Sequence, residues 1–365
     1  MTLSSGHSKG TPPNRKLATL IHISDSHFSA RFIADANWLR RWFAEIPGVQ
    51  ATFGHSYPVA RSLAIRVNQF IVARRAQQIP VCVVFTGDLS RRGDRAELAT
   101  GATFFRSAHF TGATDPVGLN LKPTRSRKHR NRAGTLFSVP GNHDIWQRRH
   151  PDRLDDFRQH FPDTFPAVAE IKTPGRPIVL WGLDSTQNTQ LRHRLALGRL
   201  SERQLESLRL GLKATVAAFD SQPIQIVCLH HPLTDPPETQ FSHTMRLDNR
   251  EAVARALREA GVDLVLAGHV HESFFTDATH NAPAQAIAGT ACQQCSPAGW
   301  SFLVLDVFDQ EIVAHVLEYD RERLAFCEGS ASPKVFSLRR PDSGPAQLPT
   351  GDVTARQRFG SLEFD

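Results

Sequence analysis

Residues 81–88 read Val-Cys-Val-Val-Phe-Thr-Gly-Asp, and this stretch contains the pattern that decides the fold. Its five apolar residues, three of them β-branched, predict a strand that is buried on both faces. A glycine and a carboxylate follow almost at once, where the chain leaves the sheet through a tight turn. The same design, an apolar strand followed by a short polar loop, recurs in four other segments: 17–27, 135–143, 224–231 and 262–271.

Helical patterns separate these strands. Apolar residues recur at helical spacing in the segments 59–77, 95–105, 201–212 and 250–260, and Ser201 is a candidate N-cap. Strands that alternate with helices predict a layered α/β core. Three later apolar runs are expected to be strands that close the sheets into a sandwich covered by helices: 285–288, 301–308 and 311–317.

The loop after each of these five strands carries side chains that can bind a metal ion. They are Asp25, His27, Asp88, Asn142, His143, His230, His269 and His271. Carboxylate and amide oxygens suit Mn or Mg, whereas imidazoles suit Zn, Fe or Co, so the set selects no single metal. In Asp25-x-His27 and in His269-x-His271, a spacing of two would send both side chains to one face of extended backbone.

One such loop alone indicates little, because a lone histidine at a strand end is more often structural than metal-binding. The five loops together resemble the calcineurin-like metallophosphoesterase family, whose signature is D-x-H, G-D, G-N-H-[DE], H and G-H-x-H. This sequence has Asp25-Ser-His27, Gly87-Asp88, Gly141-Asn-His-Asp144, His230 and Gly268-His-Val-His271. The resemblance spans residues 25–271 and implies a four-layer αββα sandwich of two mixed sheets flanked by helices.

The resemblance also implies a role for each position. It places Asp88 between two divalent metal ions (Mn, Fe, Zn or Co), one held by Asp25, His27 and His271, and the other by Asn142, His230 and His269. A hydroxide bridging two such ions would attack phosphorus in line. His143 would be the catalytic residue that contacts the phosphate and assists the leaving group.

Two neighbouring residues are harder to assign. His231 follows a ligand, and we expect it either to support the ligands from behind or to face the substrate. For Asp144, two roles are about equal: orienting a nearby imidazole, or capping a helix N-terminus.

The second block separates branches of the family. Protein Ser/Thr phosphatases have G-D-x-V-D-R-G there, whereas this sequence has Gly87-Asp-Leu-Ser-Arg-Arg-Gly93 and lacks the second Asp. The G-N-H-D, H-H-P and G-H-V-H blocks, and Gly182-Leu-Asp-Ser185, look more like the cyclic-nucleotide and glycerophosphodiester phosphodiesterases. We therefore expect hydrolysis of a small phosphodiester. A metal-dependent nuclease or nucleotide pyrophosphatase is the alternative, and a non-catalytic scaffold is less favoured because no ligand is missing.

The net charge of +7 has a local origin. Six basic residues and no acid lie between Lys122 and Arg132, and without these six the 43 Lys and Arg fall to 37 against 36 Asp and Glu. The segment could follow a nucleic-acid backbone in a nuclease, but a solvated surface loop is favoured.

The ends and insertions complete the expected organisation. We expect a disordered segment over 1–16, one domain over 17–340 with insertions near 35–57 and 111–134, and a polar tail over 341–365. A helix is expected over 37–46 within the first insertion. No signal-peptide or membrane-spanning run occurs, so a cytoplasmic protein is the default. Five dispersed cysteines argue against a disulfide framework, and a zinc site at Cys292-x-x-Cys295 is weakly supported. The oligomeric state is left open.

Overall fold

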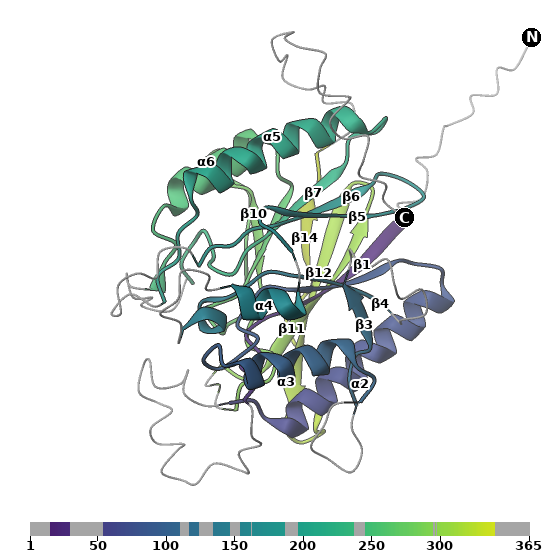
Figure 1. Cartoon of the computed structure of the whole chain (residues 1–365). Helices are drawn as coiled ribbons and strands as arrows, with labels where there is room; N and C mark the ends of the chain where they lie inside the picture. The colour runs from purple at the N-terminus through teal and green to yellow at the C-terminus, as the bar shows by residue number, and fades with distance from the viewer. Residues whose placement is uncertain are drawn as a thin grey trace, which may run out of the picture.

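Two β-sheets packed face to face form the centre of the computed structural model (Figure 1). It describes residues 15–29, 54–109, 117–123, 134–146, 154–161, 163–186, 196–236, 245–294, 296 and 298–339. Helices α2 (Tyr57–Ala76) and α3 (Arg95–Arg106) cover one sheet, and α5 (Glu202–Ala218) and α6 (Arg250–Glu259) cover the other (Figure 1). The layers therefore run helix, sheet, sheet, helix, which confirms the expected αββα sandwich.

The first sheet combines parallel and antiparallel strands. Its members are β1 (Lys16–Ile23), β2 (Val81–Phe85), β3 (Leu121–Pro123), β4 (Gly134–Ser138), β11 (Ser301–Phe308), β12 (Glu311–Asp320), β13 (Ala325–Glu328) and β14 (Lys334–Ser337). They lie in the order β13-β12-β11-β1-β2-β4-β3, and β14 also pairs with β12. Strands β1, β2, β4 and β3 are parallel, whereas β11 to β14 are joined by antiparallel pairing.

The second sheet has a parallel centre with an antiparallel strand at each edge. Its members are β5 (Ala167–Ile171), β6 (Ile178–Gly182), β7 (Ile224–Cys228), β8 (Leu264–Ala267), β9 (Phe274–Thr276) and β10 (Ala284–Ile287). The order is β5-β6-β7-β8-β10-β9. Because β6, β7, β8 and β10 are parallel, their carboxyl ends meet at one edge of the sheet.

The strands are apolar throughout because each face of a central strand meets another layer. In β1, Ala18 and Leu20 pack between the two sheets, whereas Ile21 and Ile23 pack against the side that α2 and α3 cover. The opposite helices contribute residues such as Leu208 to a third cluster with the outer face of the second sheet. Full burial of each such side chain contributes about 1.5–3 kcal/mol, so the sheets hold the loops at their ends firmly.

Two helix ends follow from single residues. The Ser201 hydroxyl accepts a hydrogen bond from the Gln204 backbone N–H at 3.2 Å, as expected of an N-cap. Helix α6 stops just before Gly261, which has a φ of +81° that a side chain would strain.

Several elements differ from the sequence-based prediction. Part of the expected surface loop over 111–134 joins the first sheet, since Leu121–Pro123 forms β3 parallel to β4. The sequence pattern also missed α4 (Asp155–His160) and the edge strands β5, β9, β13 and β14. The expected helix over 37–46, most of the basic segment, the N-terminal segment to residue 14 and the tail from 340 lie outside the described residues.

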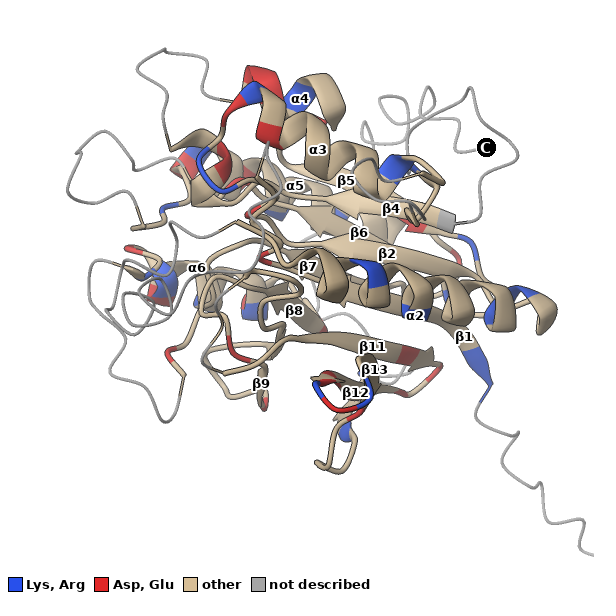
Figure 2. Cartoon of the chain, turned by 90° about the horizontal axis from the view of Figure 1, so that it is seen from below, with Lys and Arg blue, Asp and Glu red and all other residues tan. Residues whose placement is uncertain are grey.

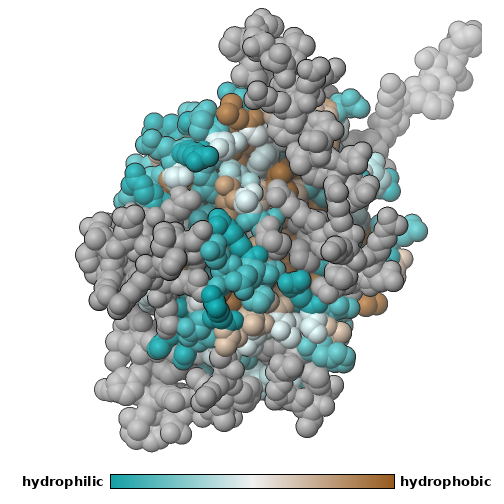
Figure 3. All heavy atoms as spheres, viewed as in Figure 1, coloured by the Kyte–Doolittle hydropathy of each residue, from teal (hydrophilic) through white to brown (hydrophobic). Residues whose placement is uncertain are grey.

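Charged residues gather on the helices, turns and loops, while the strands are largely uncharged (Figure 2). The described surface on the face of Figure 1 mixes hydrophilic residues with scattered apolar ones (Figure 3). Within the described part of the chain, no helix combines the length and apolar character needed to cross a membrane.

Candidate metal centre

The eight predicted site residues lie in loops that leave the carboxyl ends of β1, β2, β4, β7 and β8. Backbone hydrogen bonds tie these loops together. The Asp25 N–H donates to the Gly87 carbonyl at 3.0 Å, and the Gly268 N–H donates to the His230 carbonyl at 3.0 Å. The His269 N–H then donates to Asp25 Oδ2 at 2.9 Å, which joins the first and last loops. All eight side chains are buried except His271, whose side chain is 20% exposed.

A first group of potential metal ligands combines Asp25, His27, Asp88 and His271, whose ligand atoms all lie within 4.8 Å of one another. Asp25 Oδ1 is 3.2 Å from His271 Nε2 and 3.8 Å from His27 Nε2. Asp88 Oδ2 lies 3.8 Å from the same His27 nitrogen. Two carboxylates and two imidazoles of this group are therefore close enough together to bind a single metal ion.

A second group combines Asp88, His230 and His269, again with ligand atoms within 4.8 Å. The His230 Nε2 atom is 3.3 Å from Asp88 Oδ2 and 3.0 Å from the amide oxygen of Asn142. The two groups share Asp88 and no other residue, so one carboxylate stands between two sets of ligands.

Backbone carbonyls select which ring nitrogen of two histidines faces the second group. His230 Nδ1 donates to the Thr86 carbonyl at 2.7 Å, and His269 Nε2 donates to the Met245 carbonyl at 2.8 Å. In the neutral rings, the lone pairs then lie on His230 Nε2 and His269 Nδ1, which face each other at 3.1 Å. Carbonyl groups that fix the tautomer in this way are typical of metal-binding histidines.

These contacts fit a cation. Two imidazole lone pairs at 3.1 Å repel each other unless a proton or a metal ion lies between them, and His27 Nε2 and His271 Nε2 also lie 3.1 Å apart. The buried Asp25 Oδ1 accepts no hydrogen bond from the described residues, so this oxygen is available to a cation. Burial disfavours a charged His230, yet Asp88 and Asp25 raise its pKa to about 9, so the site attracts positive charge.

Backbone strain coincides with the site. Among the described residues, eight non-glycine residues have a positive φ, and five of them are predicted ligands: Asp25, His27, Asp88, His269 and His271, with φ between 47° and 74°. Left-handed backbone costs about 1–3 kcal/mol per non-glycine residue and persists where the surroundings enforce it, often at functional sites. The sequence analysis expected extended backbone in Asp25-x-His27 and in His269-x-His271, and this expectation was wrong. The side chains converge because sharp left-handed turns aim them.

Close approach of the loops depends on glycine at two positions. A Cβ on Gly141 would overlap the carboxylate and backbone N–H of Asp88, and a Cβ on Gly268 would overlap Ser24 and the carboxylate of Asp25. A side chain at either position would push a predicted ligand away from the others.

His143 lies beside the groups of ligands rather than within one. Its backbone N–H donates to Asp88 Oδ1 at 2.8 Å, and its Nδ1 donates to the Arg91 carbonyl at 2.7 Å. Nε2 is therefore the ring atom left to act on a substrate. The edge of Trp146 packs against the ring, with centroids 3.7 Å apart. Burial lowers the pKa of His143 to about 3, although Asp88 opposes that shift.

Asp144 and His231 both act as supports for the loops. Asp144 accepts hydrogen bonds from the backbone N–H groups of Ser90 at 2.9 Å and Gly141 at 3.0 Å, so it joins two ligand loops and caps the N-terminus of the 3-10 helix Asn142–Ile145, one of its two expected roles. His231 bonds to the Ser185 hydroxyl at 2.8 Å and the Ala196 carbonyl at 3.2 Å, which occupies both ring nitrogens. In the sequence, Asp144 is marked by the acid of the G-N-H-D block, and the partner of His231 lies in the Asp-Ser pair at 184–185. Neither pattern indicates which groups these side chains bond to.

The weakly supported zinc site is only partly described. Cys292 is buried, and its thiol donates to the Ser26 carbonyl at 3.4 Å, while Cys295 lies outside the described residues.

The sequence matches the calcineurin-like phosphoesterase family over residues 18–273, more than half of the chain. The chain belongs to this family. It is 26% identical over 217 residues to a cAMP/cGMP dual specificity phosphodiesterase of Mycobacterium tuberculosis. That match covers 58% of this chain and 55% of the relative, so the chain spans about half the length of the curated relative it matches.

One solved structure shares the fold at low identity: GAP50, the anchor in the inner membrane complex of Plasmodium, with 11% identity, a TM-score of 0.54 and 94% of both chains covered. The chain is similar to a lesser degree to the sulfate thiohydrolase SoxB of Thermus thermophilus, with 14% identity, a TM-score of 0.46, and 90% of this chain and 58% of that chain covered.

Proposed function

We propose that this chain hydrolyses a small phosphodiester, such as a cyclic nucleotide or a glycerophosphodiester, with the help of two divalent metal ions. The observation that carries this proposal is the pair of ligand groups that share Asp88. In the proposed site, Asp25, His27 and His271 would hold one ion, Asn142, His230 and His269 would hold the other, and Asp88 would be the ligand shared by both. Two such ions supply Lewis acidity and lower the pKa of water, which makes a nucleophile available at neutral pH.

The chain's own contribution begins with orientation. The carbonyls of Thr86 and Met245 hold the two imidazoles of the second group with their lone pairs inward. Asp144 fixes the loops of Asp88 and Asn142 relative to each other, so the ligands are in position before any ion or substrate binds.

His143 supplies the proton. With Nδ1 committed to the Arg91 carbonyl, Nε2 faces the substrate. Burial keeps the free ring neutral, but a bound phosphate ester brings negative charge that favours the protonated form. His143 then takes up a proton with the substrate and passes it from Nε2 to the departing alkoxide oxygen as the phosphorus–oxygen bond breaks.

The small-diester preference is supported by the branch motifs and by the named activity of the mycobacterial relative. The rival nuclease hypothesis depends on the basic segment, of which only Lys122 and Pro123 fall within the described residues. Outside that segment the charges nearly balance, which leaves little surface charge to hold a polyanion.

A substrate screen tests the proposal. Mn-reconstituted protein is assayed with cAMP, glycerophosphocholine, an aryl phosphomonoester and single-stranded DNA at low and moderate salt. We expect the fastest turnover with a small diester, with little dependence on salt. A variant with the six basic residues of 122–132 changed to Gln should keep that turnover.

Other outcomes would replace the proposal. DNA cleaved fastest, with a steep loss in salt and in the six-residue variant, would establish the nuclease alternative. Metal-loaded protein that turns over none of these substrates would favour the non-catalytic scaffold.

A further inference from the structure

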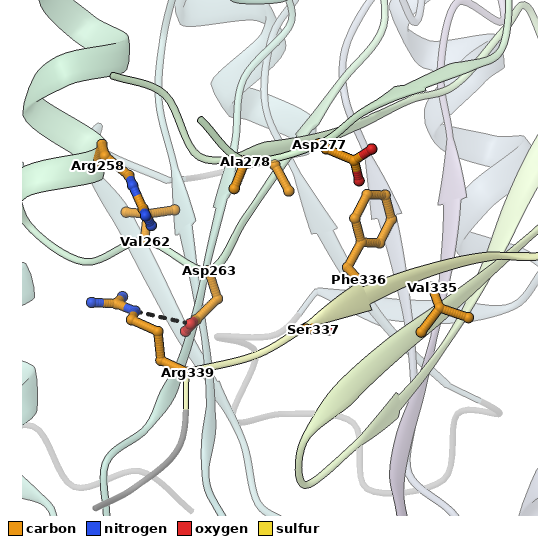
Figure 4. A pocket seen from close by; sticks show the side chains of 10 residues that line it. Arg258, Val262, Asp263, Asp277, Ala278, Val335, Phe336, Ser337 and Arg339 are labelled. Atoms are coloured by element: carbon orange, nitrogen blue, oxygen red, sulfur yellow. Dashed lines mark hydrogen bonds and ion pairs between the residues drawn. The ribbon is translucent and has the colours of Figure 1, made fainter. Parts of the chain in front are cut away.

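A pocket of about 250 Å³ opens at the end of the second sheet opposite the metal centre (Figure 4). Arg258 of α6, Val262 and Asp263 ahead of β8, Ala278 after β9, Phe336 of β14 and Arg339 contribute to its wall. Strand β8 runs from this pocket toward His269. The six residue-to-residue steps from Asp263 to His269 span on the order of 20 Å of extended chain. The pocket is therefore separate from the site already described.

The charged groups of the wall balance in number, with two arginines and two aspartates, but they are not all paired with one another. Arg339 Nε pairs with Asp263 Oδ1 at 3.4 Å, and Lys334, which lies outside the wall, pairs with Asp277 Oδ1 at 2.6 Å. The Arg258 side chain makes no ion pair or hydrogen bond with any residue that the structure describes. Its guanidinium extends along the wall beside Val262 (Figure 4), and no described carboxylate is paired with it.

A buried cation that does not line the pocket, Arg176, acts on one of its carboxylates. Arg176 is 5% exposed and donates from Nε to the Gln222 carbonyl at 2.9 Å and from Nη1 to the Asp309 carbonyl at 2.7 Å. Arg176 and Arg339 both act electrostatically on the Asp263 carboxylate, whose Oδ2 also accepts the Gln225 backbone N–H at 2.9 Å. Asp263 is thus engaged by other groups, and Arg258 is left to bind an anion from outside the chain.

Apolar side chains complete the wall. Phe336 stands across the pocket from Arg258 and Val262, with Ala278 at the upper margin (Figure 4). The volume lies just below the ~300–1,000 Å³ of sites for drug-sized ligands. A guanidinium on one side and an aromatic ring on the other suit a small molecule with an anionic group and an apolar ring.

We propose that this pocket is a binding site for a small organic anion, a carboxylate or phosphate group attached to an apolar ring. Arg258 binds the anionic group, and the apolar wall of Val335, Phe336 and Ala278 contacts the ring. The proposal is independent of the activity at the metal centre, because it uses no residue of that site.

Calorimetric titration of the Mn-reconstituted full chain tests this site with two probes, benzoate and benzylphosphonate. The first carries a carboxylate, the second a phosphonate that is not hydrolysed. Benzyl alcohol and inorganic phosphate are the controls, since one lacks the charge and the other lacks the ring. We expect at least one probe to bind about tenfold or more tightly than either control. The stronger probe then identifies the anionic group that the site prefers.

Variants locate the binding. Arg258→Gln should weaken it about tenfold or more, whereas Arg255→Gln, an exposed arginine on the same helix that does not line the pocket, should leave it unchanged. At the exposed mouth, Ala278→Glu should weaken binding and Ala278→Lys should strengthen it, and neither change disturbs the core. Unaltered thermal unfolding of each variant confirms its fold.

Three results would overturn the proposal. The first is the absence of saturable binding of both probes up to about 10 mM. The second is binding that persists unchanged in Arg258→Gln and Ala278→Glu, which would place the probes elsewhere, including at the metals. The third is equal binding of benzyl alcohol, which would show an apolar site without selectivity for anions.

Discussion

Two buried aspartates of this chain, Asp306 and Asp88, are held in opposite ways. Asp306 in β11 accepts from the Thr19 hydroxyl at 2.6 Å, pairs with Lys16, and pairs with Arg74 Nη2 at 3.1 Å. Asp88 meets only imidazoles and backbone N–H groups, with His230 Nε2 at 3.3 Å and the His143 N–H at 2.8 Å. The chain neutralises Asp306 with two permanent cations, whereas the positive charge beside Asp88 comes either from a proton on His230, whose pKa Asp88 raises, or from a bound cation.

This difference separates folding from binding. An aspartate whose charge the chain neutralises stabilises the fold in the absence of any ligand. An aspartate that faces imidazoles can exchange their proton for a metal ion, and the loops around it adopt the strained backbone seen at Asp25, His27 and Asp88. Substitutions at the two aspartates should therefore have different consequences.

The largest effect is expected at Asp88. Asp88→Ala removes the one ligand shared by both groups, so kcat/KM should fall by more than about 10³-fold. The variant should also lose bound metal, measured as moles of metal per mole of chain after gel filtration. Full metal content together with full activity in Asp88→Ala would mean that no two-metal centre operates here.

Asp306→Asn is the matched change at the other aspartate. It leaves Lys16 and Arg74 without their anion, and the free energy of unfolding should fall by about 3 kcal/mol, as for a broken, mostly buried ion pair. Urea titration measures this loss. Metal content and kcat should stay at the wild-type level, and a loss of metal in this variant would remove the contrast between the two aspartates.

The third effect separates catalysis from metal binding within the site. His143→Ala should lower kcat by about 10²-fold or more while both metals stay bound. The loss should shrink for a substrate with a very good leaving group, because such a group departs without a proton. If metal analysis instead finds one ion missing, His143 is a ligand and not the proton donor.

The strands were predictable where both faces are buried. Strand β2 has the predicted bounds, Val81–Phe85, because the core covers both of its faces and excludes polar residues from them. Edge strands such as β13 escaped prediction since Ala325–Glu328 is half exposed and mixes apolar with polar residues. A strand that is buried on one face shows a weaker apolar pattern than a strand that is buried on both faces.

Two features of the structure could not be predicted from the sequence. The residue types in the five loops predicted which side chains meet, but the left-handed backbone that aims them depends on contacts between loops, such as the bond from His269 to Asp25 across 244 positions. The Asp306 cluster left no signal either, because Thr19 and Asp306 are 287 positions apart. Both features are long-range, and local spacing does not encode them.

The smallest expected effect concerns His55, a buried histidine whose pKa is lowered by burial, whereas Asp88 raises the pKa of His230. Burial lowers the pKa of His55 to about 4, from an ordinary value of 6.5. The Ser29 backbone N–H, at 3.2 Å, donates to Nδ1, which also requires the unprotonated form of that nitrogen. Protonation therefore favours the unfolded chain.

The sign of the pH dependence follows from these two pKa values. Above pH 6.5, both folded and unfolded chains carry a neutral His55, and its contribution to stability is complete. Between pH 6.5 and 4, the unfolded chain takes up a proton that the folded chain does not bind, so the stability contributed by this residue falls by about 1.4 kcal/mol per pH unit.

His55→Gln should remove that increment from the slope of unfolding free energy against pH, as measured by urea titration of metal-free protein between pH 4.5 and 7. Other buried histidines contribute equally to the slopes of the wild type and the variant, so the difference between the two slopes reports on His55 alone. Equal slopes would mean that the folded chain accepts a proton on His55, and that burial does not keep this histidine neutral.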